Sequence, residues 1–293
     1  MYVEITRRIA MTEKIALVID SGTDVPSIIR SRSDVRILPL RVIYPDKEYI
    51  DGIDIDSKTV YSRMPREIPK TSLPSMEDIL AVFTELKSEG YTHVVAVTIS
   101  SGLSGTYNTI RLISEEIEDL TVSVIDTKNI SIGSGFTAVQ VARDIDNKLN
   151  FDEIVSRASA SLSKSVIYFT VGTLEYLRKG GRIGLVAGTV ADMMNVKPII
   201  SCNKDGIYYT VEKARGRKNS IKALISRAQS FVPAGVKYQV CVIHGQVQEE
   251  FDSLVNEVRE KFKDATEIFA LSTTAALGVH TGPGALGIGI KLL

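Results

Sequence analysis

Hydroxyl side chains gather in the segment TISSGLSGTYN, residues 98–108, which follows an apolar run and leads into a helical pattern. In an open α/β sheet, ligands bind at the carboxyl ends of the strands, where a tight turn enters a helix. Serine hydroxyls and free backbone N–H groups at such a turn can bind an anion, which the helix dipole also favours. In the alternative interpretation, Ser101 or Ser104 only caps the helix. This segment alone leaves both interpretations open.

A second group of hydroxyls lies in KTSLPS, residues 70–75. Ser75 has a sufficient structural role there, because together with Asp78 it predicts the capping box of a helix. Thr71 and Ser72 have no such role, and they precede a helix start at which an anion could bind. Both are therefore candidate ligand contacts.

Among the three histidines, only His280 lies in a run of turn-forming residues, GVHTGPG. The pKa of a histidine lies close enough to neutrality for the ring to donate to a carboxylate. A structural role is the alternative, and it is the interpretation we give to His93 and His244 in their strand-like contexts. In a rival hypothesis, His280 is the base of a serine hydrolase whose nucleophile is Ser101 or Ser104, although no acid is singled out to complete the triad.

Two basic segments follow in the second half of the chain. Arg178 and Arg182 flank the glycine pair of YLRKGGRI, where cations at a helix C-terminus would also complement the helix dipole. Lys213 and Arg215 belong to KARGRK, which is either a solvated loop or part of a surface that docks a partner.

Several familiar catalytic patterns are absent. The string GPGALG, residues 282–287, has the spacing of a dinucleotide-binding loop, but only six residues follow it, too few for the required strand–helix unit. The chain has no Walker A, GxSxG or HExxH sequence. Cys202 and Cys241 lack the spacing of a metal site or of a disulfide framework. We therefore expect neither a metal nor a cofactor.

The composition is that of a soluble globular protein, since 44% of the 293 residues are hydrophobic and 24% are charged. The 35 basic and 35 acidic side chains balance, which argues against broad attraction to nucleic acid or to anionic lipid. No apolar stretch is long enough for a membrane helix, and the charged N-terminus is unlike a signal peptide. We expect a cytoplasmic protein with reduced thiols and no integral membrane association.

Strands and helices alternate in the first half of the chain, which predicts a parallel sheet with helices packed on it. Apolar runs predict the strands, and capping signals predict the helices between them. The predicted strands span residues 14–20, 35–44, 92–99 and 122–126, and the predicted helices span residues 75–89 and 104–119. Pro39 interrupts the second of these strands, which suggests an edge position or a bend.

The second half alternates less regularly and contains a hairpin signal. Helices predicted at residues 151–163, 173–179, 220–230 and 247–262 accompany strands at residues 166–171, 196–202, 206–212, 238–244 and 267–271, before a glycine-rich tail. We expect two domains, residues 14–160 and 161–293. Residues 1–13 are expected to be an N-terminal extension, because the sequence restarts with MTEK at Met11.

Seven segments, in order along the chain, resemble motifs of the DegV family, the bacterial fatty-acid-binding proteins that serve as binding subunits of fatty acid kinase. They are DSGTDVP, KTSLPS, SSGLSGTYN, IDTK, LEYLRKGGRI, VKPII and HTGPGALG, which begin at residues 20, 70, 100, 125, 174, 196 and 280. The departures are small: Gly22 stands where the family usually has another small residue or threonine, and VKPII replaces the commoner IKPIL. The resemblance covers nearly the whole chain after Met11.

The resemblance implies two domains, a three-layer α/β/α unit with a parallel sheet followed by a two-layer α/β unit with a mixed sheet. It also implies a long-chain fatty acid held in a tunnel near the domain junction. By motif match, Thr71, Ser72 and Ser101 would hydrogen-bond the carboxylate. His280 would lie close by, and Arg178 would lie near the head group or the domain rim. Hydroxyl donors could hold the carboxylate without burial of an unpaired cation.

The resemblance further implies a protein that is not itself an enzyme. It would present the bound carboxylate to a separate fatty acid kinase for acyl-phosphate formation in phospholipid metabolism, and the kinase would bring the ATP and the metal. Arg182, Lys213 and Arg215 match exposed basic positions that are implicated in docking the kinase.

Overall fold

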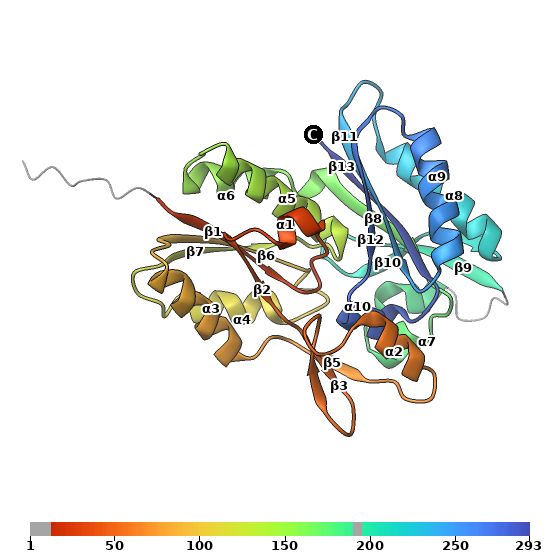
Figure 1. The fold of residues 1–293 in the computed structure, drawn as a ribbon. Coiled ribbons are helices and arrows are strands. Elements are labelled where there is room, and N and C mark those ends of the chain that lie inside the picture. Colours follow the sequence, from red (N-terminus) through yellow and green to blue (C-terminus); the bar gives the residue numbers. More distant parts are fainter. Residues whose placement is uncertain (1–12, 190–194) are drawn as a thin grey trace, which may run out of the picture.

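The computed structural model describes residues 13–189 and 195–293. A parallel sheet and a mixed sheet lie side by side, with helices around them (Figure 1). This arrangement confirms the α/β fold class predicted above, with its parallel sheet followed by a mixed sheet.

The parallel sheet has the strand order β2-β1-β6-β7. Its strands are β1 (Ile15–Asp20), β2 (Val35–Leu38), β6 (His93–Thr98) and β7 (Thr121–Asp126). One face is covered by α3 (Met76–Ser88) and α4 (Thr106–Ser114), and the other by α1 (Ser27–Arg30), α5 (Ile132–Asp146) and α6 (Phe151–Ala160). Because both faces are covered, β1 is buried throughout and its sequence is an apolar run up to Asp20.

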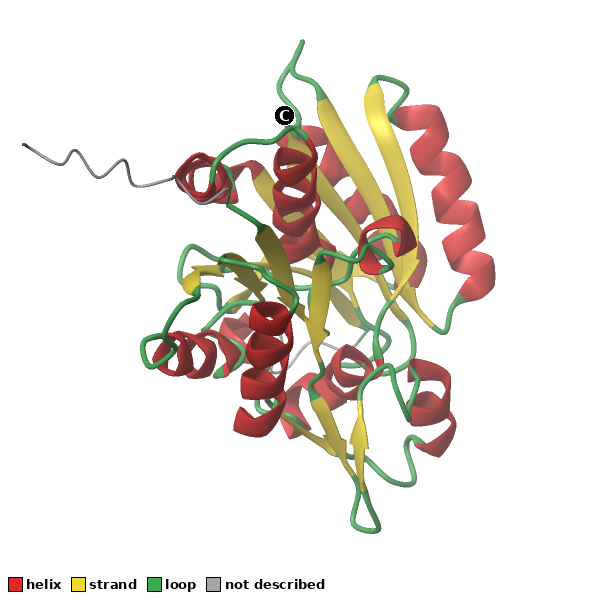
Figure 2. Cartoon of the chain, turned by 60° about the vertical axis from the view of Figure 1, so that its left-hand side comes forward, coloured by secondary structure: helices red, strands yellow, loops and turns green. Residues whose placement is uncertain are grey.

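The mixed sheet has the order β10-β9-β8-β13-β11-β12, in which β11 and β12 run parallel and the other neighbours antiparallel. Its strands are β8 (Ser165–Thr170), β9 (Val196–Cys202), β10 (Tyr208–Arg215), β11 (Tyr238–Gly245), β12 (Ala265–Ser272) and β13 (Ala285–Leu292). Helices α8 (Arg217–Phe231) and α9 (Gln248–Lys261) pack on one face (Figures 1 and 2). The predicted hairpin, β9 with β10, is confirmed.

Helix α5 lies between the two sheets and contacts β1 and β6 of one and β8 and β13 of the other. Eleven of its 15 residues are buried, so its sequence lacks the polar face that marks a surface helix, and we did not predict it. Strand β13, which we expected only as a glycine-rich tail, faces this helix. A Cβ on Gly289 would lie 2.6 Å from Cγ2 of Ile132, so glycine lets α5 approach the sheet closely.

A small antiparallel sheet from the first half of the chain packs against the second half. Its order is β4-β3-β5, with β3 (Arg41–Ile43), β4 (Glu48–Ile50) and β5 (Lys70–Ser72). Both β3 and β5, with α2 (Ser57–Arg63), contact α10 (Ala275–Thr281), which also contacts α7 (Glu175–Lys179). The break predicted at Pro39 and the edge position are confirmed, since β2 is an edge strand. Residues 35–44 do not form one strand, because the two parts on either side of Pro39 enter different sheets.

The start of α3 has the local structure that the sequence predicts. The capping box of α3 is confirmed, since Ser75 accepts from the N–H of Asp78 and the Asp78 carboxylate accepts from the N–H of Ser75, both at 3.1 Å. Two 3-10 helices, η1 (Leu162–Lys164) and η2 (Gly184–Thr189), complete the described elements.

In the described part of the chain, no helix is long and apolar enough to cross a membrane. The division into residues 14–160 and 161–293 stays a prediction, and residues 1–12 of the expected extension lie outside the described residues.

Candidate ligand-binding site

A cavity of about 220 Å³ lies where the two large sheets, the small sheet and α10 meet. Much of its lining is apolar, from side chains such as Ile99, Ile167, Phe169 and Ile243. Its polar lining includes five side chains that the sequence singled out: Thr71, Ser72, Ser104, Arg182 and His280. An apolar cavity with a few polar groups is the usual form of a small-molecule site.

Thr71 and His280 come together from opposite ends of the chain. Thr71 lies in β5, opposite Val42 of β3, and its Oγ1 is 2.7 Å from Nε2 of His280 on α10. Ser72, the next residue, is exposed, and its Oγ donates to the carbonyl of Leu73 at 3.3 Å. The small sheet and α10 thus bring two of the predicted site residues into direct contact.

The environment of His280 keeps its ring neutral. Burial, together with the positive charge of Arg182, lowers the pKa of His280 to about 3. Its Nδ1 is buried and has no hydrogen-bond partner among the described residues. An unpartnered buried acceptor is tolerated more readily than an unpartnered N–H, so we assign the proton to Nε2, which then donates to Thr71. The hydroxyl proton of Thr71 is thereby free to donate to a ligand.

Arg182 reaches the cavity because the chain reverses after α7. Gly181 has a φ of 71°, and the N–H of Arg182 donates back to the carbonyl of Leu177 at 2.9 Å, as in a Schellman motif. The guanidinium donates to the carbonyls of Leu103 at 3.2 Å and Gly180 at 2.8 Å. No carboxylate of the described residues forms an ion pair with it.

The structure places Arg182, rather than Arg178, at the cavity. Helix α7 turns Tyr176 and Leu177 into the core, so Arg178 points outward and is exposed, whereas Arg182 is half-buried. We expected Arg178 near the head group or the domain rim, and Arg182 on a docking surface.

Gly180 lets the end of α7 approach the site histidine. A Cβ at this position would lie 2.1 Å from Nδ1 of His280, a distance that no real contact reaches. Its φ of −77° is open to any residue, so glycine is required here for space and not for backbone conformation. The first glycine of the diglycine motif therefore shapes the wall behind the ring.

The serine turn after β6 contributes Ser104 to the cavity, and not Ser101. At the start of α4, Oγ of Ser104 accepts from the N–H of Thr106 at 3.3 Å and lies 2.8 Å from Oγ1 of the same residue. The N-cap of α4 is Gly105, without a side-chain capping bond, so Ser104 is not the helix cap, and its side chain lies in the cavity wall.

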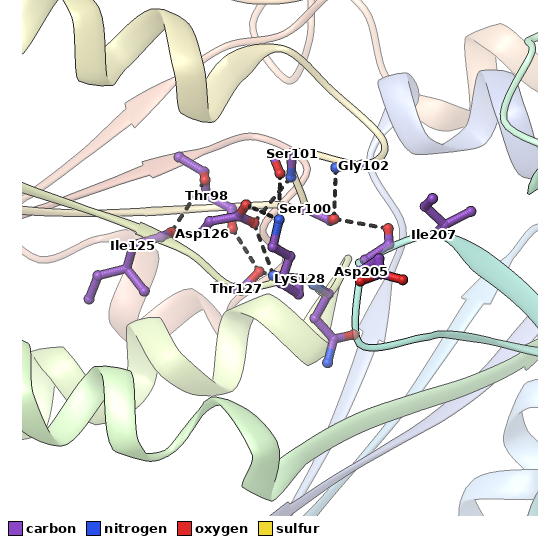
Figure 3. Close-up of polar contacts among 12 residues, drawn as sticks. Thr98, Ser100, Ser101, Gly102, Ile125, Asp126, Thr127, Lys128, Asp205 and Ile207 are labelled. Carbon is purple, nitrogen blue, oxygen red and sulfur yellow. Dashed lines mark hydrogen bonds and ion pairs between the residues drawn. The ribbon is translucent and has the colours of Figure 1, made fainter.

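Ser101 lies instead in a polar cluster at the ends of β6 and β7 (Figure 3). Its Oγ accepts from Nζ of Lys128 at 2.7 Å, and Lys128 pairs with Asp126 at 2.7 Å. Burial raises the pKa of Asp126, but hydrogen bonds from Lys128 and Ser101 outweigh it and hold that pKa below its usual range. Next to it, Oγ of Ser100 donates to the carbonyl of Gly206 in the β9–β10 turn at 2.9 Å. The cluster therefore fastens the serine turn to the second half of the chain. The IDTK motif contained Asp126 and Lys128, but its sequence suggested no role for them.

The geometry does not assemble the rival serine hydrolase. Within residues 13–189 and 195–293, neither Ser101 nor Ser104 hydrogen-bonds a histidine. The side-chain partners of Ser101 are Lys128, whose ammonium group donates to the hydroxyl, and Asp126, and neither is the histidine base that a Ser-His-Asp triad requires. In the same residues, no three or more His, Cys, Asp or Glu side chains are placed to hold a metal ion.

Three buried carboxyl groups that we did not single out lie beside the cavity: Asp20, Asp24 and Asp51. Ser131, which lines the cavity, donates to Asp24 at 2.6 Å. Asp51 accepts from the N–H of Ala275, the first residue of α10, at 2.9 Å, and thereby positions the helix that carries the site histidine. Burial raises the pKa of Asp20 to about 6 and that of Asp24 to about 7. The sequence signal that could have pointed to Asp20 and Asp24 is their position at the two ends of the DSGTD segment.

Lys213 and Arg215 are exposed on β10, which is an edge strand of the mixed sheet. Ala214 between them is buried, because successive side chains of a strand point to opposite faces. Both cations therefore face solvent together.

A parallel and a mixed sheet around an apolar cavity define the class of fold, and comparison with known proteins identifies the family. The chain matches the model described as "Uncharacterised protein, DegV family" over residues 14–292. It is 42% identical over 276 residues to a DegV domain-containing protein of Clostridium acetobutylicum, a match that covers 94% of this chain and 98% of that one. The chain therefore belongs to the DegV family.

Solved structures with the same fold include proteins that bind fatty acids. A fatty-acid-binding DegV family protein of Thermus thermophilus is similar at a TM-score of 0.89 and 27% identity, over 96% of this chain and 100% of that one. A stearic-acid-binding protein of Eubacterium ventriosum is similar at a TM-score of 0.86 and 31% identity, over 95% of this chain and 98% of that one.

Proposed function

We propose that the protein binds a long-chain fatty acid in the cavity, with the carboxylate held by Thr71 and Arg182 beside neutral His280. One observation carries the proposal: the guanidinium of Arg182 lines an apolar cavity, and no described carboxylate pairs with it. Arginine is well suited to a carboxylate, which it binds with strong, charge-assisted hydrogen bonds. The fatty acids bound by the relatives from Thermus and Eubacterium support this choice of ligand.

The energetics divide between the two ends of the ligand. Each buried methylene contributes about 0.8 kcal/mol, so a long chain supplies on the order of 10 kcal/mol before the costs of binding. A buried carboxylate without a partner would offset much of that gain. The head-group contacts therefore provide orientation, and the apolar walls of the tunnel that we propose provide most of the affinity.

The other predicted residues take graded roles in this proposal. Ser72 and Ser104 line the cavity and would add hydroxyls near the head group. Ser101 and Arg178 lie outside the lining, so any influence of theirs on the ligand would be indirect. For Ser101, that influence would pass through the turn that it fastens together with Lys128.

We further propose that the protein is non-catalytic and delivers its ligand in the cytoplasm. A separate fatty acid kinase would dock on the surface that includes Lys213 and Arg215 and would convert the presented carboxylate to an acyl phosphate for phospholipid metabolism. Both cations are exposed on an edge strand, where a partner could reach them.

Mass spectrometry of ligand extracted from the purified protein tests the proposal, and we expect it to recover a long-chain fatty acid. Recovery of no lipid, together with an esterase activity that Ser101→Ala abolishes, would favour the hydrolase instead.

The two arginines of one motif provide a matched pair of variants. Loss of a charge-assisted hydrogen bond should make Arg182→Gln bind a fluorescent fatty acid about tenfold or more weakly than the wild type. Arg178→Gln should bind it as the wild type does, because Arg178 is exposed and away from the cavity. Equal affinities in the two variants, both shown to be folded by thermal unfolding, would remove Arg182 from the site.

A further inference from the structure

A second cavity, of about 420 Å³, lies between the C-terminal half of α5, the segment from α6 to η1, and the ends of β11 and β13. It shares no lining residue with the first cavity. Its lining is rich in polar and charged side chains, which include Gln140, Arg143, Asp144, Arg157, Lys164 and Lys291. None of them has a role in the function proposed above.

Lys291 is a buried cation in the wall of this second cavity, with only 2% of its surface exposed. Its Nζ donates to the carbonyl of Ser161 at 2.8 Å. An ammonium group carries three N–H donors, and no carboxylate of the described residues forms an ion pair with this one. Lysine is almost never fully buried unless it is paired. Among the described residues, Lys291 therefore lacks the counter-charge that a buried lysine usually has.

The sheet fixes the position of Lys291. Side chains alternate along β13, so Lys291 lies on the same face as Gly289, the face that packs on Ile132 of α5. Gln239 of β11 is its direct cross-strand neighbour and is also buried. Lys291 is thus held in place at the cavity and is not a mobile surface lysine.

Of the four cationic side chains that line this cavity, two have no ion-pair partner among the described residues. Arg143 pairs with a glutamate of β12 at 2.6 Å, and Arg157 pairs with Asp144 at 3.0 Å. No described carboxylate forms an ion pair with Lys164 or Lys291. Burial lowers the pKa of Lys291 to about 8, and the positive charge of Lys164 acts in the same direction. An anion between the two lysines would stabilise the charged form of Lys291 against burial and would offset its repulsion from Lys164.

We propose that this cavity binds a dianionic phosphate group, either inorganic phosphate or a phosphate monoester, between Lys164 and Lys291. A dianion compensates both lysines, whereas a monoanion would leave one of them unmatched. Lysine binds phosphate as a point charge, and the amide of Gln140 adds a neutral donor in the lining. The buried position of Lys291 excludes competing water and strengthens the interaction.

Isothermal titration calorimetry of the full chain with inorganic phosphate and with methyl phosphate tests this site. We expect the wild type to bind at least one of them, and Lys291→Met to bind it about tenfold or more weakly. Lys164→Met should also weaken binding, and it replaces an exposed residue. As the control, Lys222→Met changes an exposed lysine of α8, on the opposite face of the mixed sheet, and should leave binding unchanged.

Tighter binding of methyl phosphate would identify a phosphate monoester as the ligand, and tighter binding of inorganic phosphate would identify the free ion. Thermal unfolding establishes that each variant is folded, and Lys164→Met keeps the test decisive even where Lys291→Met does not fold. The proposal is overturned if the wild type binds neither compound, or if the folded lysine variants bind as the wild type does.

Discussion

Thr71 depends on His280 for the direction in which its hydroxyl donates. The ring is neutral because it is buried beside Arg182, and its Nε2–H occupies the oxygen of Thr71. The hydroxyl proton can then point only toward another acceptor. At the scale of single residues, the site is a chain of hydrogen bonds in which His280 donates to Thr71 and thereby leaves the Thr71 hydroxyl to donate to a ligand.

Removal of the first of these donors should be visible in ligand affinity. Thr71→Val keeps the shape of the side chain and loses the hydroxyl, so a titration with fluorescent fatty acid should show binding about tenfold weaker. Ser101→Ala should leave affinity within about twofold of the wild type, because Ser101 does not line the cavity. A larger loss of affinity in Ser101→Ala than in Thr71→Val would show that Ser101, and not Thr71, binds the carboxylate.

The contact between Gly180 and His280 predicts a stability effect. Gly180→Ala places a methyl group against Nδ1, and such overpacking should lower the free energy of unfolding by about 1–3 kcal/mol in urea denaturation. Gly188→Ala is the matched control, since a Cβ there meets no atom within 4 Å. Equal stabilities of the two variants would show that the ring moves aside at little cost.

The start of helix α5 and the turn after β1 are joined by the hydrogen bond from Ser131 to the buried carboxyl group of Asp24, and this junction of elements should make stability depend on pH. The pKa of Asp24 is raised from its ordinary value to about 7 in the folded protein. A carboxyl group with a raised folded pKa contributes stability that is fully present below its unfolded pKa. That stability is lost as the pH rises through the folded pKa.

Asp24→Asn isolates this contribution, because the amide oxygen can still accept the hydrogen bond of Ser131. Between about pH 5 and about pH 8, the wild type should lose about 3 kcal/mol more stability than the variant. Urea denaturation at the two pH values measures the difference. Parallel pH profiles of the two proteins would mean that the carboxyl group at Asp24 titrates as it does in the unfolded chain.

In the molecule as a whole, the cavity and the proposed docking surface belong to different parts of the mixed sheet. Lys213 and Arg215 lie toward the end of the edge strand β10, whereas the cavity is lined by strands β8, β11 and β13 and by Tyr208 at the start of β10. Ligand binding and partner docking should therefore respond to separate substitutions.

Charge reversal at both docking positions tests this separation. The variant Lys213→Glu with Arg215→Glu should slow phosphorylation of the bound fatty acid by a fatty acid kinase catalytic subunit about tenfold at low salt. Its affinity for fatty acid should not change. Lys222→Glu, on the exposed side of α8, is the control for net charge, and equal phosphorylation rates of the two variants would remove the docking role.

The parallel sheet and the hairpin were predictable because their signals are local, such as the apolar run of β1 or the turn between β9 and β10. Helix α5 and strand β13 were not, since each is buried on both sides and lacks a periodic polar face. The choice between Arg178 and Arg182 depends on a chain reversal at two glycines, and spacing alone cannot show which arginine then faces inward. The meeting of Thr71 with His280 could be expected only from the family resemblance, because no local pattern links positions 209 residues apart.

The walls of the first cavity come from the parallel-sheet half, the small sheet, α10 and the mixed sheet. An occupant of such a cavity contacts both large sheets or the turns that follow their strands, the small sheet and α10, and it packs against apolar side chains as a core residue does. By mass action, its binding free energy then adds to the folding equilibrium of the whole chain, by RT ln(1 + [L]/Kd). In thermodynamic terms, a fatty acid held there would stabilise the folded chain as a further hydrophobic core residue would. This residue is not encoded in the sequence and comes from the surroundings of the protein.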